Sequence, residues 1–222
     1  SINEINALRK HLEQLKGGQL ARLASPAALA SLVLSDVVGS PLDVIASGPT
    51  VPDRSTWTEA WQIVQRYGLE PALPAAVTQR LRAGLAGLLP DTPTAGDPLF
   101  DRCQTVVVAD NGRAAQAAAA QAEALGFNAA LLSTFVEGEA REVARVAVAL
   151  GREAAAHGRP LAAPACLLLG GETTVTLAGQ GRGGRNQELA LAAALALARV
   201  PEGQRIVIAA LATDGSDGPT DS

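Results

Sequence analysis

The residues best suited to chemistry form a glycine-rich run from Gly179 to Glu188, which reads Gly-Gln-Gly-Arg-Gly-Gly-Arg-Asn-Gln-Glu. Glycines after a strand let the backbone approach a ligand closely. A helix starting at Asn186 would present unpaired N–H groups and a positive dipole end to an anion. Arg182 and Arg185 would add guanidinium groups that bind carboxylate or phosphate. The run therefore predicts an anion-binding site, with a flexible hairpin loop before a capped helix as the structural alternative.

The same glycines do not make a recognised nucleotide motif. Gly179, Gly181 and Gly184 satisfy the pattern G-x-G-x-x-G, but the acidic residue about 20 positions on, at the end of a second strand, is absent. The Walker A pattern is also missing, because no lysine follows a glycine loop. The residues alone therefore indicate neither a dinucleotide fold nor a P-loop.

A second candidate is the acidic run from Thr213 to Asp221, which follows an apolar segment expected to be a strand. Ligands of open α/β sheets bind beyond the carboxyl ends of the strands, and clustered carboxylates there suit Mg²⁺. Asp214 and Asp217 are the predicted metal ligands. An Asp-Gly turn that only reverses the chain explains the run as well.

Other polar residues follow predicted strands or loops. Asp36 ends an apolar run, where a carboxylate is costly unless it binds a partner, caps a helix or faces solvent. Ser47-Gly48-Pro49-Thr50 is either a binding loop or a turn. Glu172 is a candidate general base or indirect Mg²⁺ contact, with a turn carboxylate as the alternative. His11 and His157 lack a neighbouring nucleophile, which favours structural roles.

The composition favours a small-molecule substrate. The 222 residues carry a net charge of −4, which provides no basic face for nucleic acid or anionic lipid. No stretch approaches the roughly 20 apolar residues of a membrane span. Cys103 and Cys166 have no partner spacing, which favours a reducing compartment, the cytoplasm. Because the chain starts at Ser1, lacks methionine and stops in an apparent loop, we expect both ends to be cut.

The elements expected in the first half are helices, one strand and a long loop. Ser1 and Glu4 have the spacing of a capping box, and helical periodicity then continues to Gly17-Gly18, which places Lys16 at a helix end. Lys10 and Lys16 are the only lysines, and we weigh phosphate contact against a helix-surface role. The further elements are a buried strand over 31–38, a loop over 39–53, and helices over 55–67 and 74–88.

The second half predicts a mixed α/β arrangement after a linker at 89–98, where we place a domain boundary. A strand at 105–109, a turn at Asn111-Gly112, a helix over 113–125 and a strand at 128–133 would make one βαβ unit. A helix should open at Glu137 and run to about 157. The remaining elements are strands at 165–169, 173–177 and 205–212, with a helix over 186–198.

Motifs along nearly the whole chain resemble the glycerate 2-kinase family, whose C-terminal domain is called MOFRL. The matching motifs are Glu4-Ile5-Asn6, Arg9-Lys10-His11-Leu12, Lys16-Gly17-Gly18, Ser35-Asp36-Val37, Ile45–Thr50, Gly138–Glu142, Gly170–Val175, Gly183–Glu188 and Thr213–Thr220. The resemblance implies an α/β fold of two domains, both partial here. Residues 1–95 would be the C-terminal portion of a Rossmann-like parallel-sheet domain, and residues 96–222 a truncated MOFRL-type domain.

The resemblance further implies ATP-dependent, Mg²⁺-assisted phosphorylation of D-glycerate to 2-phosphoglycerate. Association into a homo-oligomer is compatible with it. In this hypothesis Arg185 holds the substrate carboxylate or the transferring phosphoryl group, and Asp36 orients the 2-hydroxyl. Lys16 and the amides of Gly17 and Gly18 face phosphate oxygens. Asp214 and Asp217 bind Mg²⁺. The substrate- and nucleotide-binding candidates are Gly17, Gly18, Ser47, Gly48, Thr50, Gly170, Gly171, Glu172, Gly183, Gly184, Asn186 and Glu188.

Two other functions stay open at this point. Proteins of this family have been labelled hydroxypyruvate reductases, but the absent acidic partner argues against an NAD(P)H site. A non-catalytic sugar-phosphate-binding protein would leave the acidic loops unexplained.

Overall fold

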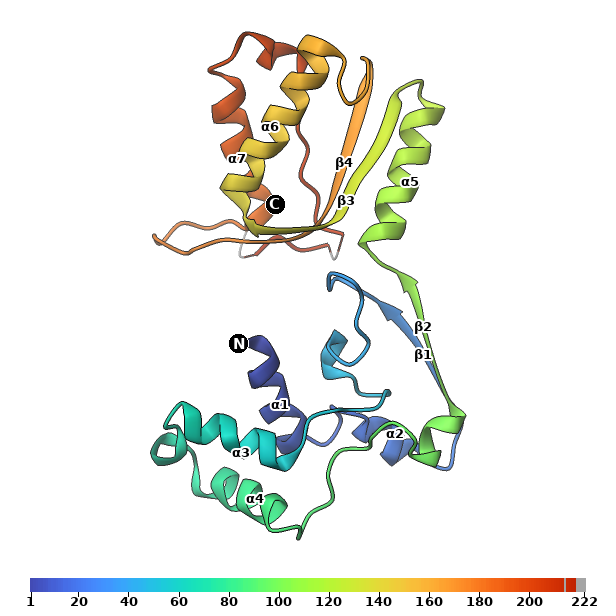
Figure 1. The fold of residues 1–222 in the computed structure, drawn as a ribbon, viewed down its shortest axis with the longest axis vertical. Coiled ribbons are helices and arrows are strands. Elements are labelled where there is room, and N and C mark those ends of the chain that lie inside the picture. Colours follow the sequence, from blue (N-terminus) through green and yellow to red (C-terminus); the bar gives the residue numbers. More distant parts are fainter. Residues whose placement is uncertain (214, 219–222) are drawn as a thin grey trace. The chain divides into compact units, whose positions relative to one another are not determined.

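The structure is a computed structural model that describes residues 1–213 and 215–218. The chain forms two compact units, of which unit 1 comprises residues 1–35 and 40–108 and unit 2 comprises residues 36–39 and 109–222. Figure 1 labels their helices and strands. The domain boundary expected at 95/96 stays a prediction.

Unit 1 is mainly helical. Its helices are α1 (Ile2–Leu12), α2 (Gln19–Ala24), α3 (Trp57–Arg66) and α4 (Ala75–Leu85), and its strands are β1 (Leu29–Leu34) and β2 (Cys103–Ala109). The predicted capping box of α1 is confirmed. The helix ends at Leu12, so the prediction that it continues to Gly17 is wrong. The Glu13 carboxylate accepts the N–H groups of Leu15 and Lys16, both at 3.1 Å, and such side-chain bonds compete with helix.

The core of unit 1 lies between α3 and α4. Trp57, Trp61, Val64 and Leu81 are buried there, with leucines of α1 packed against them. A Cβ on Gly84 would lie 2.1 Å from the Trp57 ring, so only glycine lets the helix and this ring approach so closely. The two predicted helices are thus confirmed, although each is shorter than expected.

The strand predicted at 31–38 is shorter than expected and is not buried. β1 pairs with β2 in a two-stranded sheet. Leu32 and Leu34 are 76% and 74% exposed on one face of the sheet. An unbroken apolar run indicates a strand but does not show whether both faces are covered.

Unit 2 is an α/β arrangement around a parallel strand pair. Its elements are α5 (Asn111–Ala124), β3 (Asn128–Glu139), α6 (Ala140–His157), β4 (Ala165–Thr174) and α7 (Arg185–Leu197). β3 pairs with β4 in parallel, and α6 makes the crossover between them. In the view of Figure 1, α5 lies on one side of the strand pair and α6 and α7 on the other.

This topology corrects the predicted βαβ unit. The strand before α5 is β2, which pairs with β1, so the observed unit is β3–α6–β4 instead. Sequence order shows that strands follow one another, whereas pairing depends on contacts between distant segments.

Three boundaries in unit 2 also differ from expectation. Asn111-Gly112 is the first turn of α5, because the Asp110 carboxylate caps the helix by accepting the Arg113 N–H at 2.8 Å. Glu137 belongs to β3 rather than to a helix start. The two short strands expected around Gly170-Gly171 are one continuous strand, β4.

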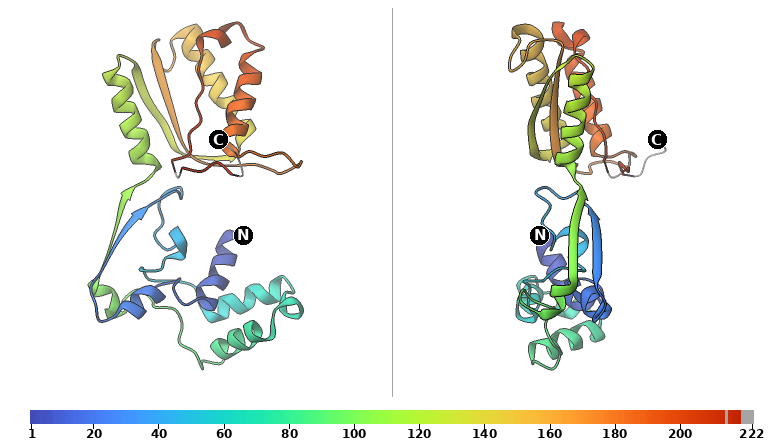
Figure 2. Two further views of the ribbon diagram at one scale, coloured as in Figure 1. Left: turned by 180° about the vertical axis from the view of Figure 1, so that it is seen from behind. Right: turned by 90° about the vertical axis from the view of Figure 1, so that its right-hand side faces the viewer.

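The strand predicted at 205–212 has no strand partner among the described residues. A short 3₁₀ helix ends at Arg205, and the following residues are extended without a ladder, as Figure 2 shows. Ile208 packs against Ala144, Val148 and Ala193 of α6 and α7. Among the helices of the described part of the chain, none has the length and apolar character needed to cross a bilayer.

Candidate active site

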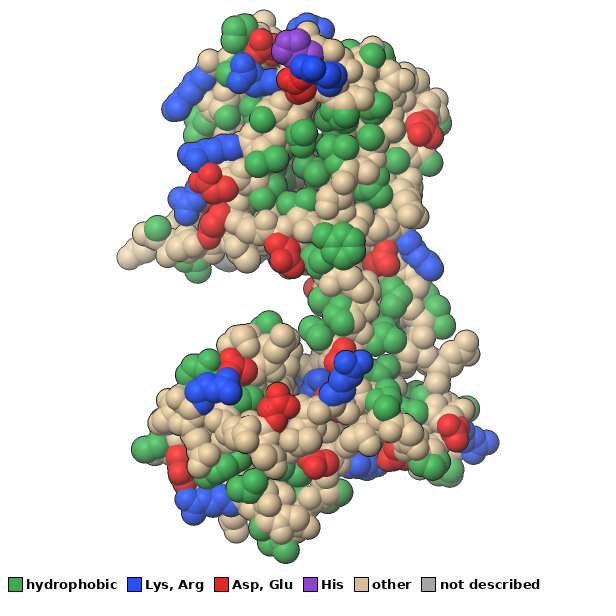
Figure 3. Space-filling view, in the orientation of Figure 1, with side chains coloured by type: hydrophobic (Ala, Val, Ile, Leu, Met, Phe, Trp, Pro, Cys, Tyr) green, Lys and Arg blue, Asp and Glu red, His purple; other side chains and the backbone are tan. Residues whose placement is uncertain are grey.

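A cavity of about 550 Å³ in unit 2 collects many of the predicted residues. Most of its wall is apolar and consists of alanine and leucine from α5, α6, β4 and the segment 206–212. Figure 3 shows that apolar side chains also gather on the side of unit 2 that faces the viewer. The predicted residues that line the cavity are Asp36, Gly170, Gly171, Glu172, Arg185 and Asn186.

Arg185 and Glu172 form an ion pair in this cavity wall. Arg185 is the first residue of α7, and Glu172 lies near the carboxyl end of β4. Because β4 runs through Gly170-Gly171 without a break, Glu172 is a strand residue and not a turn carboxylate. The sequence analysis assigned separate roles to Arg185 and Glu172, and the tertiary structure shows that their side chains are paired.

The start of α7 is capped by a carboxylate of the protein itself. Asp217 Oδ1 accepts the Asn186 N–H at 2.9 Å and the Asn186 Nδ2 group at 3.1 Å, and Oδ2 accepts the Gln187 N–H at 2.8 Å. These backbone groups are among the N–H groups that the sequence assigned to a ligand. The anion found at the helix start is therefore Asp217.

The electrostatics of Asp217 agree with this geometry. Partial burial tends to raise the pKa of its carboxyl, but the hydrogen bonds from Asn186 and Gln187 and the nearby Arg185 charge together lower the pKa. Asp217 is thus a carboxylate at neutral pH, and its negative charge is favourable at the N-terminal end of a helix dipole.

The glycines before α7 have an internal reason for their size. A Cβ on Gly184 would lie 1.9 Å from the Asp217 carbonyl oxygen, and a Cβ on Gly218 would lie 2.6 Å from the Gly183 carbonyl oxygen. Two backbone segments are therefore in direct contact at this point. The glycines that seemed suited to a ligand are needed for the contact between these segments.

Only one of the two predicted metal ligands can be compared with the structure. Asp214 lies outside the described residues, and its role as a ligand stays a prediction. Asp217 is engaged with α7, and among the described residues no group of three or more His, Cys, Asp or Glu side chains could hold a metal ion.

The sequence missed one polar residue of the cavity. Asn111, at the first position of α5, lines the cavity and donates from Nδ2 to the Thr134 carbonyl oxygen at 3.1 Å. A Cβ on Gly170 would be 3.7 Å from the Asn111 side chain. The available signal was Asp110-Asn111 directly after an apolar strand, but the sequence pattern Asn111-Gly112 was interpreted as a turn.

In unit 1 the predicted glycine pair meets the predicted loop. The N–H of Gly17 donates to the Ser47 carbonyl oxygen at 2.8 Å, and the N–H of Gly18 donates to that of Gly48 at 2.7 Å. Ser47 is buried and has a φ of 62°, which is unfavourable for a residue other than glycine. The structure therefore brings these four residues together, but the two amides expected to face phosphate are bonded to carbonyls.

A buried ion pair lies behind this glycine pair. Lys10 Nζ is 2.8 Å from Asp53 Oδ1, and the side chains are 9% and 1% exposed. Asp53 also accepts the hydroxyl of Ser55 at 2.6 Å and that of Thr92 at 2.9 Å. A Cβ on Gly17 would lie 3.1 Å from Asp53 Oδ2, from Lys10 Cβ and from Thr92 Cγ2. Phosphate contact, one of the two roles weighed for Lys10, is not supported because its ammonium is buried.

The two other predicted residues of unit 1 also have internal partners. Lys16 Nζ forms an ion pair with Glu13 Oε1 at 3.1 Å, and both side chains are partly exposed. The Thr50 hydroxyl is buried and accepts the Ser31 hydroxyl at 3.0 Å. Their roles in binding stay predictions.

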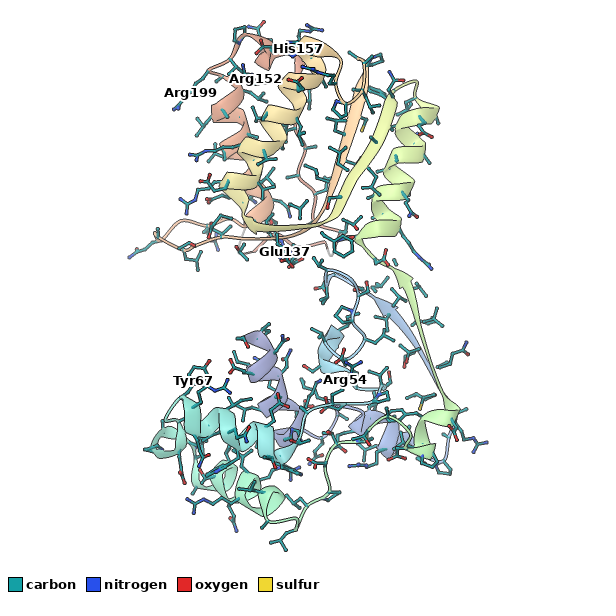
Figure 4. The ribbon with its side chains drawn as sticks, viewed as in Figure 1. Arg54, Tyr67, Glu137, Arg152, His157 and Arg199 are labelled. Carbon is teal, nitrogen blue, oxygen red and sulfur yellow. The ribbon has the colours of Figure 1, made fainter. Side chains whose placement is uncertain are left out.

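Three further side chains lie apart from the cavity of unit 2. Glu188 faces Arg141 of α6, with 3.8 Å between Oε1 and Nε. His157 pairs with Glu153 at the end of α6, and Figure 4 shows it at the opposite end of unit 2 from Glu137. In unit 1, His11 is buried against Trp57 and contacts the Ala7 carbonyl oxygen through Nδ1. The structural roles expected for both histidines fit these surroundings.

Known proteins are similar to this chain over its whole length. Residues 1–82 match a family described as a domain of unknown function (DUF4147), and residues 165–222 match the MOFRL family. The chain is 41% identical to the D-glycerate 2-kinase of Thermotoga maritima and 39% identical to the glycerate 2-kinase of Pyrococcus horikoshii, with 100% of this chain and 49% of each relative covered. The chain belongs to the glycerate 2-kinase family.

Solved structures agree with this family assignment. A crystal structure described as a glycerate kinase from T. maritima is 40% identical, with a TM-score of 0.81, and covers 100% of this chain and 50% of that protein. A crystal structure of a P. horikoshii protein is 39% identical, with a TM-score of 0.78, and covers 100% of this chain and 49% of that protein. The chain thus spans about half the length of the family members it matches, and the predicted α/β fold class is confirmed.

Proposed function

We propose that this chain supplies part of the active site of a kinase that transfers the terminal phosphoryl group of ATP to the 2-hydroxyl of D-glycerate. The observation that carries this proposal is the 39–41% identity to named glycerate 2-kinases along the whole chain. The cavity of unit 2 supports it, because an arginine paired with a glutamate lines its wall beside a helix start. The names of the relatives support neither the reductase nor the non-catalytic alternative.

Arg185 is the residue on which the proposal depends most. Phosphoryl transfer needs positioning and charge neutralisation more than covalent help from the protein. A guanidinium group matches the carboxylate of glycerate or the oxygens of a transferring phosphoryl group. The ion pair with Glu172 orients this group, and Asp36, which lines the same cavity, orients the 2-hydroxyl.

We propose, on the family resemblance, that the phosphoryl donor is ATP with Mg²⁺. The described residues do not form a metal site of their own. Mg²⁺ often reaches a kinase site bound mainly to nucleotide phosphates and water, with one or two carboxylates from the protein. When bound, it would neutralise charge on the phosphates.

The binding residues of unit 1 are proposed with a revised reason. Gly17 and Gly18 lock the loop that carries Ser47, Gly48 and Thr50, since their amides bond to its carbonyls. Backbone strain of the kind seen at Ser47 persists only where surrounding contacts hold it, and it is frequent at ligand sites. We propose that Lys16, next to this locked loop, contacts phosphate oxygens.

A cytoplasmic location and a homo-oligomer are further proposals. The location rests on Cys103 and Cys166, which form no disulfide and therefore fit a reducing compartment. The homo-oligomer rests on the family resemblance alone.

One coupled assay on the intact protein tests the proposed function. ADP release that requires D-glycerate, with a product that enolase accepts directly, is the expected result because enolase uses 2-phosphoglycerate and not the 3-isomer. Consumption of NAD(P)H with hydroxypyruvate would support the reductase instead. If neither reaction occurs, the non-catalytic alternative is favoured.

A further inference from the structure

The carboxylate of Asp217 is held by hydrogen-bond donors of α7 on both of its oxygens. It accepts three N–H groups at 2.8–3.1 Å, two from the backbone and one from the side chain of Asn186. Charge-assisted hydrogen bonds of this kind are about twice as strong as neutral ones. The carboxylate therefore already has a full structural task, which is to satisfy the first N–H groups of α7.

The backbone around Asp217 is fitted to the same task. Gly184 precedes α7, and its missing side chain makes room for the Asp217 main chain and carboxylate. Gly218 has a φ of 77° and approaches the Gly183 carbonyl oxygen in the same way. The close approach is mainly between the two main chains, so it holds the loop 215–218 against the segment before α7 in addition to the cap itself.

The cap acts at the residue next to Arg185. Arg185 is the first helical residue, and the two amides held by Asp217 belong to Asn186 and Gln187. Glu172 of β4 holds the Arg185 guanidinium at its other end. The direction of this side chain thus depends on two anchors, one on the backbone and one on the guanidinium group.

We propose that Asp217 is a positioning residue that holds the start of α7 and thereby aims Arg185, and that it is not a ligand of the metal ion. This inference rests on the proposed kinase function for its catalytic consequence. It replaces the prediction from the sequence, in which Asp217 was a Mg²⁺ ligand. It also places the reason for Gly184 inside the protein and not in a bound anion.

The test compares Asp217→Asn with wild type in the intact protein, by hydrogen exchange and by steady-state kinetics. Asparagine keeps one acceptor oxygen but loses the charge, so it can accept only one of the two backbone N–H groups of Asn186 and Gln187. We expect protection of the amides at 185–190 to fall by at least about tenfold, since a hydrogen bond to a charged group is lost. We expect kcat/KM for glycerate to fall on the order of 10²-fold, as a small misplacement of a binding group does.

Magnesium dependence separates the two roles of Asp217. The Mg²⁺ concentration for half-maximal activity should change less than about tenfold, the lower end of what the loss of even an indirect metal contact causes. A larger rise would make Asp217 a metal ligand and overturn the proposal. Unchanged amide protection would overturn it as well. Glu123→Gln, an equal charge change at an exposed position of α5, should alter none of these values.

A second pair of variants tests the cap without replacing Asp217 itself. A Cβ on Gly184 meets the Asp217 main chain, whereas a Cβ on Gly181 has no neighbour within 4 Å. Gly184→Ala should therefore reproduce the losses of protection and kcat/KM, and Gly181→Ala should not. Equal behaviour of the two variants would contradict the proposed contact. If the wild type transfers no phosphoryl group, the proposed function is wrong, while the exchange comparison still decides whether Asp217 caps α7.

Discussion

Unit 1 and unit 2 each pack a glycine against an aspartate, but the two aspartates lie in different surroundings. Asp53 of unit 1 is 2% exposed and is held by Lys10 and two hydroxyl groups. Asp217 of unit 2 is partly exposed and is held by the first amides of a helix. The same pair of residue types thus gives a buried ion pair in one unit and a helix cap beside a binding arginine in the other.

The different surroundings of the two aspartates predict which property a substitution near each of them should change. A buried ion that loses its partner has no water to replace it, so the whole fold is destabilised. A partly exposed cap can regain water, so its loss changes mainly the position of neighbouring groups. Variants around Asp53 should therefore lower the free energy of unfolding, and variants around the start of α7 should lower catalysis.

The largest effect is expected for Lys10→Met. Removing the ammonium leaves the Asp53 carboxylate buried without its charge partner, and the free energy of unfolding should fall by about 3–5 kcal/mol. Urea denaturation measures this value. The double variant Lys10→Met with Asp53→Asn removes both charges and should recover part of the loss. Exposed ion pairs contribute at most about 1 kcal/mol to the free energy of unfolding. If Lys10→Met lowers this free energy by no more than that, the pair does not behave as a buried ion pair.

The second largest effect is expected for Arg185→Ala in unit 2. Removing the guanidinium should lower kcat of the intact protein by on the order of 10²-fold or more, because a charge-stabilising group is lost. The free energy of unfolding should change little, which is the opposite of Lys10→Met. Arg199→Ala, just beyond the other end of α7 (Figure 4), is the control and should keep full activity. Near-normal turnover of Arg185→Ala would remove this residue from the proposed mechanism.

Gly17→Ala should have a smaller effect, and Gly68→Ala is its matched control. The two glycines have nearly equal φ values, 59° and 60°, so the backbone strain of about 1–2 kcal/mol is common to both variants. Only Gly17 has neighbours, with Asp53 and Lys10 at 3.1 Å from a Cβ. Crowding should therefore add about 1–3 kcal/mol to the loss of unfolding free energy. Equal losses for both variants would mean that Asp53, Lys10 and Thr92 can move away from the added methyl group without a loss of stability.

The smallest effect is the acid dependence of stability from Asp53. Burial tends to raise the pKa of this carboxyl, but the hydrogen bonds and charge of Lys10, Ser55 and Thr92 outweigh it, so the folded pKa lies below the ordinary value of 3.8. A carboxyl with a lowered folded pKa stabilises the fold above its unfolded pKa, and this contribution is lost as the pH falls through the folded value. Thermal unfolding followed from pH 5 to about pH 2 should show the loss below about pH 4.

The variant Asp53→Asn identifies the source of that loss. It lacks the titrating group, so its unfolding temperature should depend less on pH in this range than that of the wild type. If both proteins lose stability in parallel below about pH 4, the acid sensitivity comes from other carboxyl groups and not from Asp53.

Much of the fold could be predicted because its signals are local. The capping box at Ser1 and Glu4, the helix after Gly184 and the helices α1, α3 and α4 depend on residues within a few positions of one another. The short helix α2 was not predicted. The strand pairing could not be predicted in this way. β2, α5 and β3 are consecutive in sequence, yet β3 pairs with β4 after a crossover of 25 residues between Glu139 and Ala165.

The candidate site was predictable in its residue types but not in its contacts. Arg185, Glu172 and Asp36 were identified from their places after strands and before a helix, and the structure puts all three in the wall of one cavity. Asn111 was missed because its dipeptide reads as a turn.

Motifs, periodicity and caps lie in short segments, so the family resemblance, the α/β class and the approximate starts of the helices other than α2 follow from the sequence alone. The contacts of the polar groups in the loops become visible only in the folded chain. The amides of Gly17 and Gly18 bond to carbonyls about 30 residues away, and those of Asn186 and Gln187 bond to Asp217 about 30 residues away. The physical reason is that a loop amide bonds to whichever acceptor the packed chain brings to it, and packing of distant segments is not encoded in local spacing.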